Sequence, residues 1–453
     1  MKANIPDATY WMVGAACISY GGYEFSRAAT ITLILSDLGA NFIPPALIAV
    51  AFTSAVFVVV YRKYLKRYGA RSALIASSTG LALFFYASAL LLSLLPTGGT
   101  QDPTTCTSRR KALVFVTYVI RQAYCTFLAS QQFSFIVSLL ETNQDSLGPI
   151  YACSSLASAL AAYCAASLLP VQSLCVGATS LMVSCILANK AYAQATSNIN
   201  VAHRLQDQAS QSIPDTGPGL PVNRGTPASS SNASIKTLTF TSLRSYFSLP
   251  GVFQQNSRLY TLFIITGIMQ AIVSLLALSY SKFLETDLNE NDRTKFVGRF
   301  YAIANFTSAL VQLLGLRLLV KHLGLDVLML VQPLLICVAV IVALMYPTLH
   351  TSAFAVLMFK TIEYSLFSGV KDLTYLPLSF QARFVAKEYT DVFSYRAGKC
   401  LSAISLTVVG ICGYTFTPWT MLFVSLLLTG VWLFISYRAL VKEQSVKVVH
   451  AVL

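Results

Sequence analysis

Ten Lys, Arg, Asp and Glu side chains lie between residues 360 and 399 of a chain that is otherwise poor in charge. Apolar runs flank this segment on both sides. Ionisable groups at membrane depth are tolerated mainly where they face a wet cavity or one another. The cluster therefore predicts a path for a solute through a membrane.

Two pairs within this cluster are spaced three residues apart, which places each pair on one face of a helix. Lys360 and Glu363 have opposite charges, so they either neutralise each other or take part in gating or coupling. Arg396 and Lys399 are both positive and have no acid adjacent on that face. Two cations on one face predict contact with an anion.

Six more charged residues, Asp391 among them, lie between these two pairs. We expect Lys371 to contact the solute, and Asp372 to act in coupling or gating at the cytoplasmic end of its span. The loop residues Arg383, Lys387 and Glu388 are better explained as a solvated connection.

A second set of polar residues interrupts the first apolar run, where Tyr23, Glu24 and Arg27 occur together. Glu24 and Arg27 either form an ion pair within the helix or leave Arg27 pointing into a central cavity. There its planar guanidinium would suit a phosphate or carboxylate. Glu24, like Glu363, either neutralises cations in the empty site or takes up a proton, and the sequence does not choose. Tyr23 either stacks on a ring of the solute or lines the cavity.

Arg121 lies near the middle of another apolar run, beside Gln122 and Tyr124. No acidic residue lies within a helical turn, so its partner comes from another helix or from the solute. We favour a solute or gate contact over a structural role, with Gln122 at the gate and Tyr124 lining the site. Amides also bond across helices as packing contacts, and the weaker candidates of this kind are Gln131, Gln132 and Gln270.

The composition is that of an integral membrane protein, with 55% hydrophobic residues, 11% charged residues and a mean hydropathy of +0.63. Apolar runs of about 18 to 25 residues recur, each long enough to cross the hydrocarbon core as a helix. The net charge of +14 resides mainly in short loops, which indicates membrane topology and no nucleic-acid partner. The ten Cys are scattered without a CxxC pair, so we predict no disulfide framework, metal site or cofactor.

Twelve membrane-spanning helices are predicted. An even number places both termini on one side, and the distribution of loop Lys and Arg predicts that this side is cytoplasmic. Whether the membrane is a plasma or an organelle membrane stays open. The predicted spans are 10–35, 42–61, 72–95, 112–140, 147–168, 171–193, 259–281, 296–320, 325–346, 350–370, 392–415 and 418–438.

A polar stretch divides these spans into two groups of six. It predicts a bundle over residues 1–194, a flexible cytoplasmic linker over 195–257, and a second bundle with a short tail over 258–453. The basic segments YRKYLKRYG (61–69) and LRLLVKHLG (316–324) follow the second span of each half, as a duplicated unit would. The expected fold is an all-α membrane protein of two six-helix bundles, major-facilitator-like, with its site near the midplane.

An ordered series of motif residues occupies the charged segment. They are Glu363-Tyr364-Ser365-Leu366-Phe367, Lys371-Asp372, Tyr375-Leu376-Pro377-Leu378, Lys387, Asp391-Val392 and Gly398-Lys399. This series resembles the signature of the non-mitochondrial ATP/ADP translocase family, the nucleotide transporters of plastids and obligate intracellular parasites. Weaker similarity extends over most of the two bundles.

The resemblance implies a major-facilitator-like carrier that binds nucleotides such as ATP and exchanges or imports them without hydrolysis. Tyr23 and Arg27 match the family's first-span motif. This sequence departs from the family pattern in two ways. Uncharged residues replace charged ones at Ala28, Thr30, Ile31 and Gln122, and Glu363 replaces a lysine.

We interpret the chain as a monomeric secondary transporter that moves an anionic solute, a nucleotide or related phosphorylated metabolite, by alternating access. The alternatives are a carrier of another organic anion or a nucleoside, and a membrane receptor or scaffold that does not transport. The sequence contains no GxxxxGK[ST] motif and no nucleophile with an attendant base, so we do not expect an enzyme.

Overall fold

The computed structural model describes residues 6–95, 108–140, 147–211, 253, 256–375, 386, 389–414 and 416–452. For some helical residues in these ranges, only the backbone is described. Every regular element within them is a helix, as expected where a bilayer requires backbone hydrogen bonds to be satisfied within each segment.

Six crossings make up the N-terminal half, because α2 is long enough to supply two of them. The elements are α1 (Pro6–Asp37), the short η1 (Ala40–Phe42), α2 (Ile43–Leu94), α3 (Ser108–Leu140), α4 (Leu147–Ala165) and α5 (Pro170–Gln211). Over η1 and α2, the segments Ala40–Tyr61 and Arg71–Leu94 are each apolar enough to span a membrane.

The C-terminal half also makes six crossings. Its elements are α8 (Ser257–Asp287), α9 (Glu290–Leu310), η4 (Val311–Gly315), α10 (Leu316–Met345), α11 (Leu349–Ile362), η5 (Glu363–Phe367), α12 (Ser368–Tyr375), η6 (Tyr389–Ser394), α14 (Tyr395–Ile411) and α15 (Pro418–Val452). Gly324 has φ 76° and lets the chain turn inside α10 from one crossing to the next.

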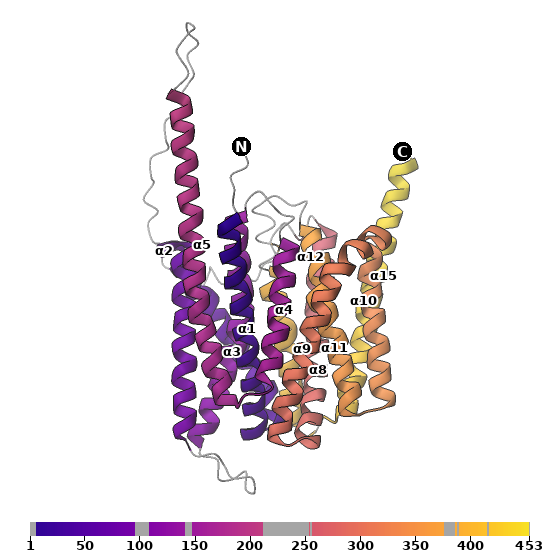
Figure 1. Ribbon diagram of the computed structural model, residues 1–453. Helices are drawn as coiled ribbons and strands as arrows, with labels where there is room; N and C mark the ends of the chain where they lie inside the picture. Colours follow the sequence, from indigo (N-terminus) through magenta and orange to yellow (C-terminus); the bar gives the residue numbers. More distant parts are fainter. Residues whose placement is uncertain are drawn as a thin grey trace, which may run out of the picture.

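The helices follow the twelve predicted spans and run side by side across the bundle (Figure 1). The first turn of α1 and the last turn of α15 lie at the same end. We call the opposite end, where α1 and α8 finish, the distal end. By length and composition alone, seven of the described segments could cross a membrane. Neither α1 nor α14 is among them, and both carry buried charges.

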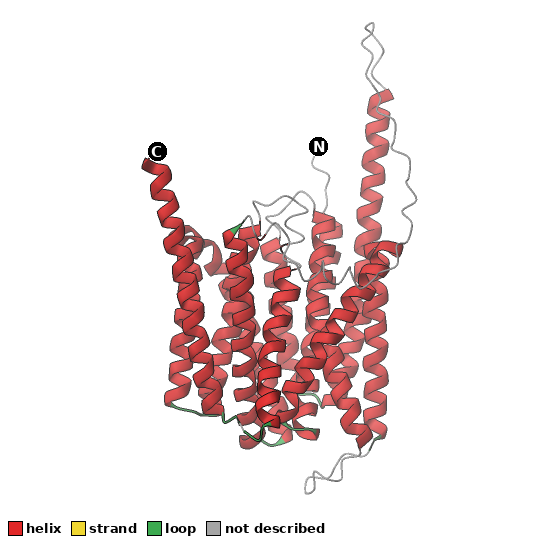
Figure 2. Cartoon of the chain, turned by 180° about the vertical axis from the view of Figure 1, so that it is seen from behind, coloured by secondary structure: helices red, strands yellow, loops and turns green. Residues whose placement is uncertain are grey.

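The sixth span was predicted to end at residue 193, whereas α5 continues to Gln211 and extends beyond its neighbours (Figures 1 and 2). Most of the predicted linker lies outside the described residues. So do the side chains of Arg62, Lys66 and Arg317, on which the predicted repeat rests.

The two halves meet where α4 packs on α9 and where α14 packs on α2. Gly298 makes the first contact possible, because a Cβ added there would lie 2.6 Å from Cβ of Ala166 and 2.8 Å from the carbonyl oxygen of Ala162. Small residues allow helix backbones to approach closely in a membrane. The glycine therefore sets the spacing of the halves near the distal end.

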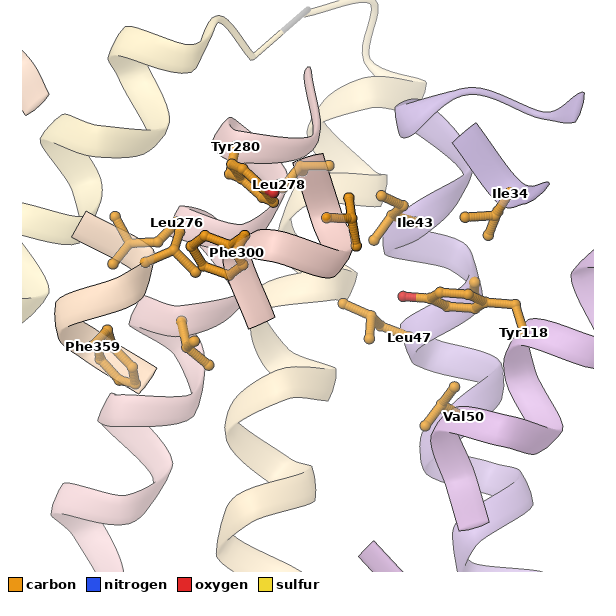
Figure 3. Close-up of a cluster of buried hydrophobic side chains, with 14 of the residues drawn as sticks. Ile34, Ile43, Leu47, Val50, Tyr118, Leu276, Leu278, Tyr280, Phe300 and Phe359 are labelled. Carbon is orange, nitrogen blue, oxygen red and sulfur yellow. The ribbon is translucent and has the colours of Figure 1, made fainter. Parts of the chain in front are cut away.

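Polar contacts also join the halves towards the distal end. The backbone N–H of Ala40 donates to Oε2 of Glu285 over 3.0 Å, and the hydroxyl of Thr294 donates to that of Thr32 over 3.2 Å. One apolar cluster continues across the same boundary, with side chains of α1, α2 and α3 on one side and of α8 and α9 on the other (Figure 3). In this conformation, the halves are closed against each other at the distal end.

Candidate functional site

Eight charged side chains are buried in the part of the chain that the structure describes: Glu24, Arg27, Arg110, Arg121, Lys360, Glu363, Arg396 and Lys399. Arg110 forms a 2.8 Å ion pair with Asp37 near the distal end. The other seven make up what we call the central cluster. All seven were predicted from the sequence as binding, coupling or gating residues.

The central cluster lies at one depth although it draws on both halves. Arg27 precedes the end of α1 at Asp37, while Arg121 follows the start of α3 and Lys360 follows the start of α11. All three helix ends are distal, and at 1.5 Å per residue these side chains originate about 15 to 20 Å inside them. That distance is near the middle of a hydrocarbon core of about 30 Å.

Arg27 forms a 3.1 Å ion pair from Nη2 to Oε1 of Glu24. Its guanidinium carbon also lies over two tyrosine rings, 4.5 Å from the centroid of Tyr23 and 4.2 Å from that of Tyr301. Tyr301 belongs to α9, so the side chain reaches the other half as well as its own helical neighbour. Of the two alternatives left open by the sequence, the intrahelical pair is present, but it leaves Nη1 without a partner among the described residues.

Arg121 is held by neutral groups. Its Nε donates to the hydroxyl of Thr30 over 2.9 Å, and Nη1 donates to the hydroxyl of Tyr23 over 3.1 Å and to Oε1 of Gln122 over 2.7 Å. Tyr23 thus contacts one arginine through its ring and another through its oxygen. Its partners on another helix, Thr30 and Tyr23 of α1, are therefore polar but uncharged.

Lys360 and Glu363 form the second ion pair, with Nζ and Oε2 2.7 Å apart. The other carboxylate oxygen, Oε1, accepts from Nε2 of Gln270 in α8 over 2.7 Å. The π-helical turn η5 begins at Glu363. Turns of this kind are frequent at functional sites because they re-aim side chains within a helix.

Arg396 crosses the boundary between the halves, since its Nη2 donates to the carbonyl oxygens of Gln122 (3.2 Å) and Ala123 (3.3 Å) in α3. Lys399 donates to the hydroxyl of Tyr395 over 2.8 Å. Between them, Gly398 brings α14 against α8, because a Cβ there would meet the carbonyl oxygen of Gly267 at 2.1 Å. Only a glycine allows this approach.

Tyr23 and Gln122 contact Arg121 of the central cluster, whereas three other predicted site residues contact groups elsewhere. Tyr124 directs its hydroxyl to that of Ser78 in α2, 2.9 Å away and inside the N-terminal half. Lys371 pairs with Asp391 of η6. Asp372 is half-buried in α12 beside it. Since Lys371 follows Glu363 by two helical turns, this pair lies about 12 Å nearer the end that holds the termini.

Two residues of α9, Tyr301 and Asn305, also lie against the central cluster. Neither was predicted from the sequence. Tyr301 lies under the Arg27 guanidinium, and the buried side chain of Asn305 lies beside the carboxylate of Glu24. An amide in the middle of an apolar span was the available signal for Asn305. Tyr301 is one of many aromatic residues in the spans, and its pattern carries no comparable signal.

The charges of the central cluster do not balance. Within the described residues it contains five cations, Arg27, Arg121, Lys360, Arg396 and Lys399, and two carboxylates. Removing charges from water is unfavourable unless they are compensated. The excess of positive charge in the central cluster would therefore be compensated by a negatively charged group.

No protein-family model and no curated protein sequence matches this chain. Solved structures match over almost all of it. A POT family transporter in complex with a thioalcohol-conjugated peptide gives a TM-score of 0.59 at 10% identity and covers 96% of both chains. The fold is that of a major-facilitator transporter.

Other structures of this fold carry different solutes according to their descriptions. A bacterial homologue of the iron transporter ferroportin, in an inward-facing state, gives a TM-score of 0.58 at 12% identity, over 97% of this chain and 99% of that one. The nucleoside transporter NupG gives 0.54 at 13% identity, over 96% and 99%. These likenesses establish the fold and leave the solute to the residues of this chain.

Proposed function

We propose that this chain is a secondary transporter that moves an anionic solute, a nucleotide or related phosphorylated metabolite, by alternating access. The observation that carries the proposal is the central cluster, with five buried cations against two carboxylates at one depth among the described residues. Contributions from α1, α3, α11 and α14 mean that both halves supply positive charge.

The surplus of charge favours an anion over a neutral solute. Arg121 and Arg396 donate to hydroxyl, amide and carbonyl oxygens, which stabilise a buried cation less than an ionised acceptor does. A phosphate or carboxylate that entered between them would supply the stronger acceptor. Planar guanidinium groups bind such oxygens through two parallel hydrogen bonds, which gives geometric selectivity as well as affinity.

Two observations support a phosphorylated or nucleotide solute within this class. Tyr23 and Tyr301 place aromatic rings beside the cations, where they offer a surface for a planar group. The motif series from residue 363 to 399 resembles the nucleotide translocase signature, and Lys399, which belongs to it, lies in the central cluster.

Alternating access requires that contacts between the halves be exchangeable. The distal contacts of Glu285 and Thr294 are hydrogen bonds to the other half, and Arg396 makes a similar bond at the depth of the cluster. Such contacts can break and reform as two six-helix bundles rock about a midplane site. We propose that the bundles span residues 1–194 and 258–453, that both termini are cytoplasmic, and that energy comes from gradients or counter-exchange.

Uptake into proteoliposomes tests the function. Purified protein should take up radiolabelled ADP, ATP or glycerol 3-phosphate, and Arg27→Ala, Arg121→Ala and Arg396→Ala should each lower the uptake at least tenfold. Arg258→Ala is the matched control, because this arginine forms an exposed pair with Asp326 far from the cluster. Uptake of neutral nucleosides with no uptake of any of these anions would contradict the proposal.

A further inference from the structure

Gln312 in η4 makes polar contacts to both halves of the molecule. Its Nε2 donates to the carbonyl oxygen of Tyr364 in η5 over 2.7 Å, within the C-terminal half. Its Oε1 accepts from the hydroxyl of Ser155 in α4 over 3.4 Å, across the boundary with the N-terminal half. One amide therefore connects α4 with the turn that begins at Glu363.

Both segments of the C-terminal half that this amide joins are π-helical turns. The turns η4 and η5 pack against each other, and each interrupts a membrane-spanning helix. A π-turn departs from the regular hydrogen-bond pattern of an α-helix, and such turns occur frequently at functional sites. The side chain of Gln312 thus adds a bond at a place where the backbone pattern of η5 is irregular.

The turn η5 reaches the central cluster through two consecutive residues. Glu363 forms the 2.7 Å ion pair with Lys360, and the ring of Tyr364 lies over the same ammonium group, with its centroid 5.1 Å from Nζ. The bond from Gln312 to the Tyr364 carbonyl oxygen therefore fixes the backbone beside two groups that contact Lys360. A shift of η5 would change the ion pair and the cation–π contact together.

The contact with α4 is suited to change as the halves move. Ser155 precedes Ala166, which makes the close contact with Gly298, by eleven residues. It therefore lies about 16 Å nearer the end that holds the termini. Its 3.4 Å bond to Gln312 is longer than the usual O–H···O distance of about 2.5 to 3.0 Å. A long bond between two halves can shorten or break when the bundles rock.

We propose that Gln312 is a positioning residue that couples the relative movement of the two halves to the surroundings of Lys360. This inference rests on the proposed function and concerns how binding of the anion drives the change of conformation. An anion that binds Lys360 alters its contacts with Glu363 and Tyr364, which shifts η5. Gln312 transmits that shift to α4, and movement of α4 acts on η5 by the same route, because coupling is reciprocal.

Amides also bond across membrane helices as simple packing contacts, and that alternative predicts a different result. A packing contact stabilises every conformation alike, so its loss lowers Tm but leaves the response to the solute intact. A coupling contact differs in energy between conformations. Its loss therefore weakens the effect that the bound solute has on the conformation.

Labelling of Thr32→Cys at the distal end measures that effect. In the full chain without native cysteines, ADP, or glycerol 3-phosphate if ADP does not bind, should change the rate of reaction with a membrane-impermeant thiol reagent at least fivefold. Gln312→Met keeps the length of the side chain without its polar atoms and should reduce this change below about twofold. Ser155→Ala removes the bond between Gln312 and α4 and should also reduce it.

Equilibrium binding distinguishes coupling from damage to the site. In both variants, the affinity for the anion should stay within about threefold of the parent, because all five cations of the central cluster remain. The maximal rate of counter-exchange in proteoliposomes should fall at least fivefold in Gln312→Met. A loss of affinity as large as the loss of rate would overturn the coupling role.

Thr307→Val is the matched control, because Thr307 of α9 bonds to Thr361 of α11 over 2.9 Å, ahead of η5 and within one half. Its labelling response should equal that of the parent. An unchanged response in Gln312→Met or in Ser155→Ala refutes the coupling, as does a parent that binds the anion without any change in labelling. If the parent binds neither anion, the proposed function falls first. Ser155→Ala decides where Gln312→Met does not fold.

Discussion

Tyr301 of α9 lies with its ring 4.2 Å from the guanidinium carbon of Arg27 in α1. The two residues come from different halves, so this contact joins the halves at the depth of the central cluster. Because the same arginine also pairs with Glu24, its position depends on both halves at once. Movement of one half against the other must therefore change the environment of Arg27.

Replacing Tyr301 tests this contact. A cation–π contact contributes about 0.5 to 2 kcal/mol, so Tyr301→Leu should weaken equilibrium ADP binding by about two- to thirtyfold as Arg27 loses its support. Tyr301→Phe keeps the ring and should stay within about twofold of the wild type. Equal losses in both variants would show that the hydroxyl, and not the ring, is the important group.

Gly398 provides a prediction about packing with a control on the same helix. Gly398→Ala places a methyl group against the Gly267 carbonyl oxygen, and overpacking of this kind costs about 1 to 3 kcal/mol. Gly410→Ala meets no described atom within 4 Å and should be neutral or slightly stabilising. Thermal unfolding in detergent should lower Tm for the first variant only. A Gly398→Ala protein as stable as the wild type would show that the helices separate freely.

Glu363 compensates Lys360 with one oxygen and accepts from Gln270 with the other. Glu363→Gln leaves the buried ammonium of Lys360 without its carboxylate, and loss of one partner of a buried pair costs about 3 to 5 kcal/mol. We expect a large fall in Tm and loss of transport. The double variant Glu363→Gln, Lys360→Met should recover most of the stability. Failure of that recovery would mean that Glu363 acts through other neighbours.

Glu24 pairs with Arg27 over 3.1 Å and so competes with an anionic solute for that guanidinium. Glu24→Gln should therefore bind phosphate-bearing solutes several-fold more tightly and release them more slowly. Counter-exchange in proteoliposomes should show a lower KM together with a lower maximal rate. A raised KM would indicate instead that Glu24 holds Arg27 in its productive position.

The distal contacts predict how the conformation responds to mutation. Glu285→Ala removes the acceptor for the Ala40 N–H, whereas Glu285→Gln retains an acceptor oxygen. In a background without native cysteines, Thr32→Cys should react several-fold faster with a membrane-impermeant thiol reagent when combined with Glu285→Ala. The Gln variant should react at the rate of the parent. Asp292→Ala, which removes an exposed pair with Lys295, is the control.

The crossings were predictable because apolar runs bounded by polar residues recur along the chain, and seven of the described segments are apolar and long enough to span a membrane by composition alone. The charged members of the central cluster were predictable for the complementary reason. An Arg or Glu in the middle of an apolar run, such as Arg121, is costly in a membrane wherever it points, so it stands out without knowledge of its neighbours.

The pairing of those charges depends on how the helices pack, which spacing alone does not specify. Lys371 is adjacent to Asp372 in sequence, yet it pairs with Asp391 of another segment. Tyr124 is three residues from Arg121, but its hydroxyl bonds to Ser78 inside the N-terminal half. The role of Tyr301 follows from the contact of α9 with α1, which no local pattern in either helix reveals.

The central claim is that the excess positive charge of the cluster binds the anionic group of a solute. Its most direct test compares the binding of ADP and of adenosine to purified protein, in the wild type and in Arg121→Gln and Arg396→Gln. The account predicts that ADP binds to the wild type far more tightly than adenosine does, and that each variant loses at least tenfold in ADP affinity. Equal binding of the two solutes, or ADP affinity unchanged by the loss of either arginine, would contradict it.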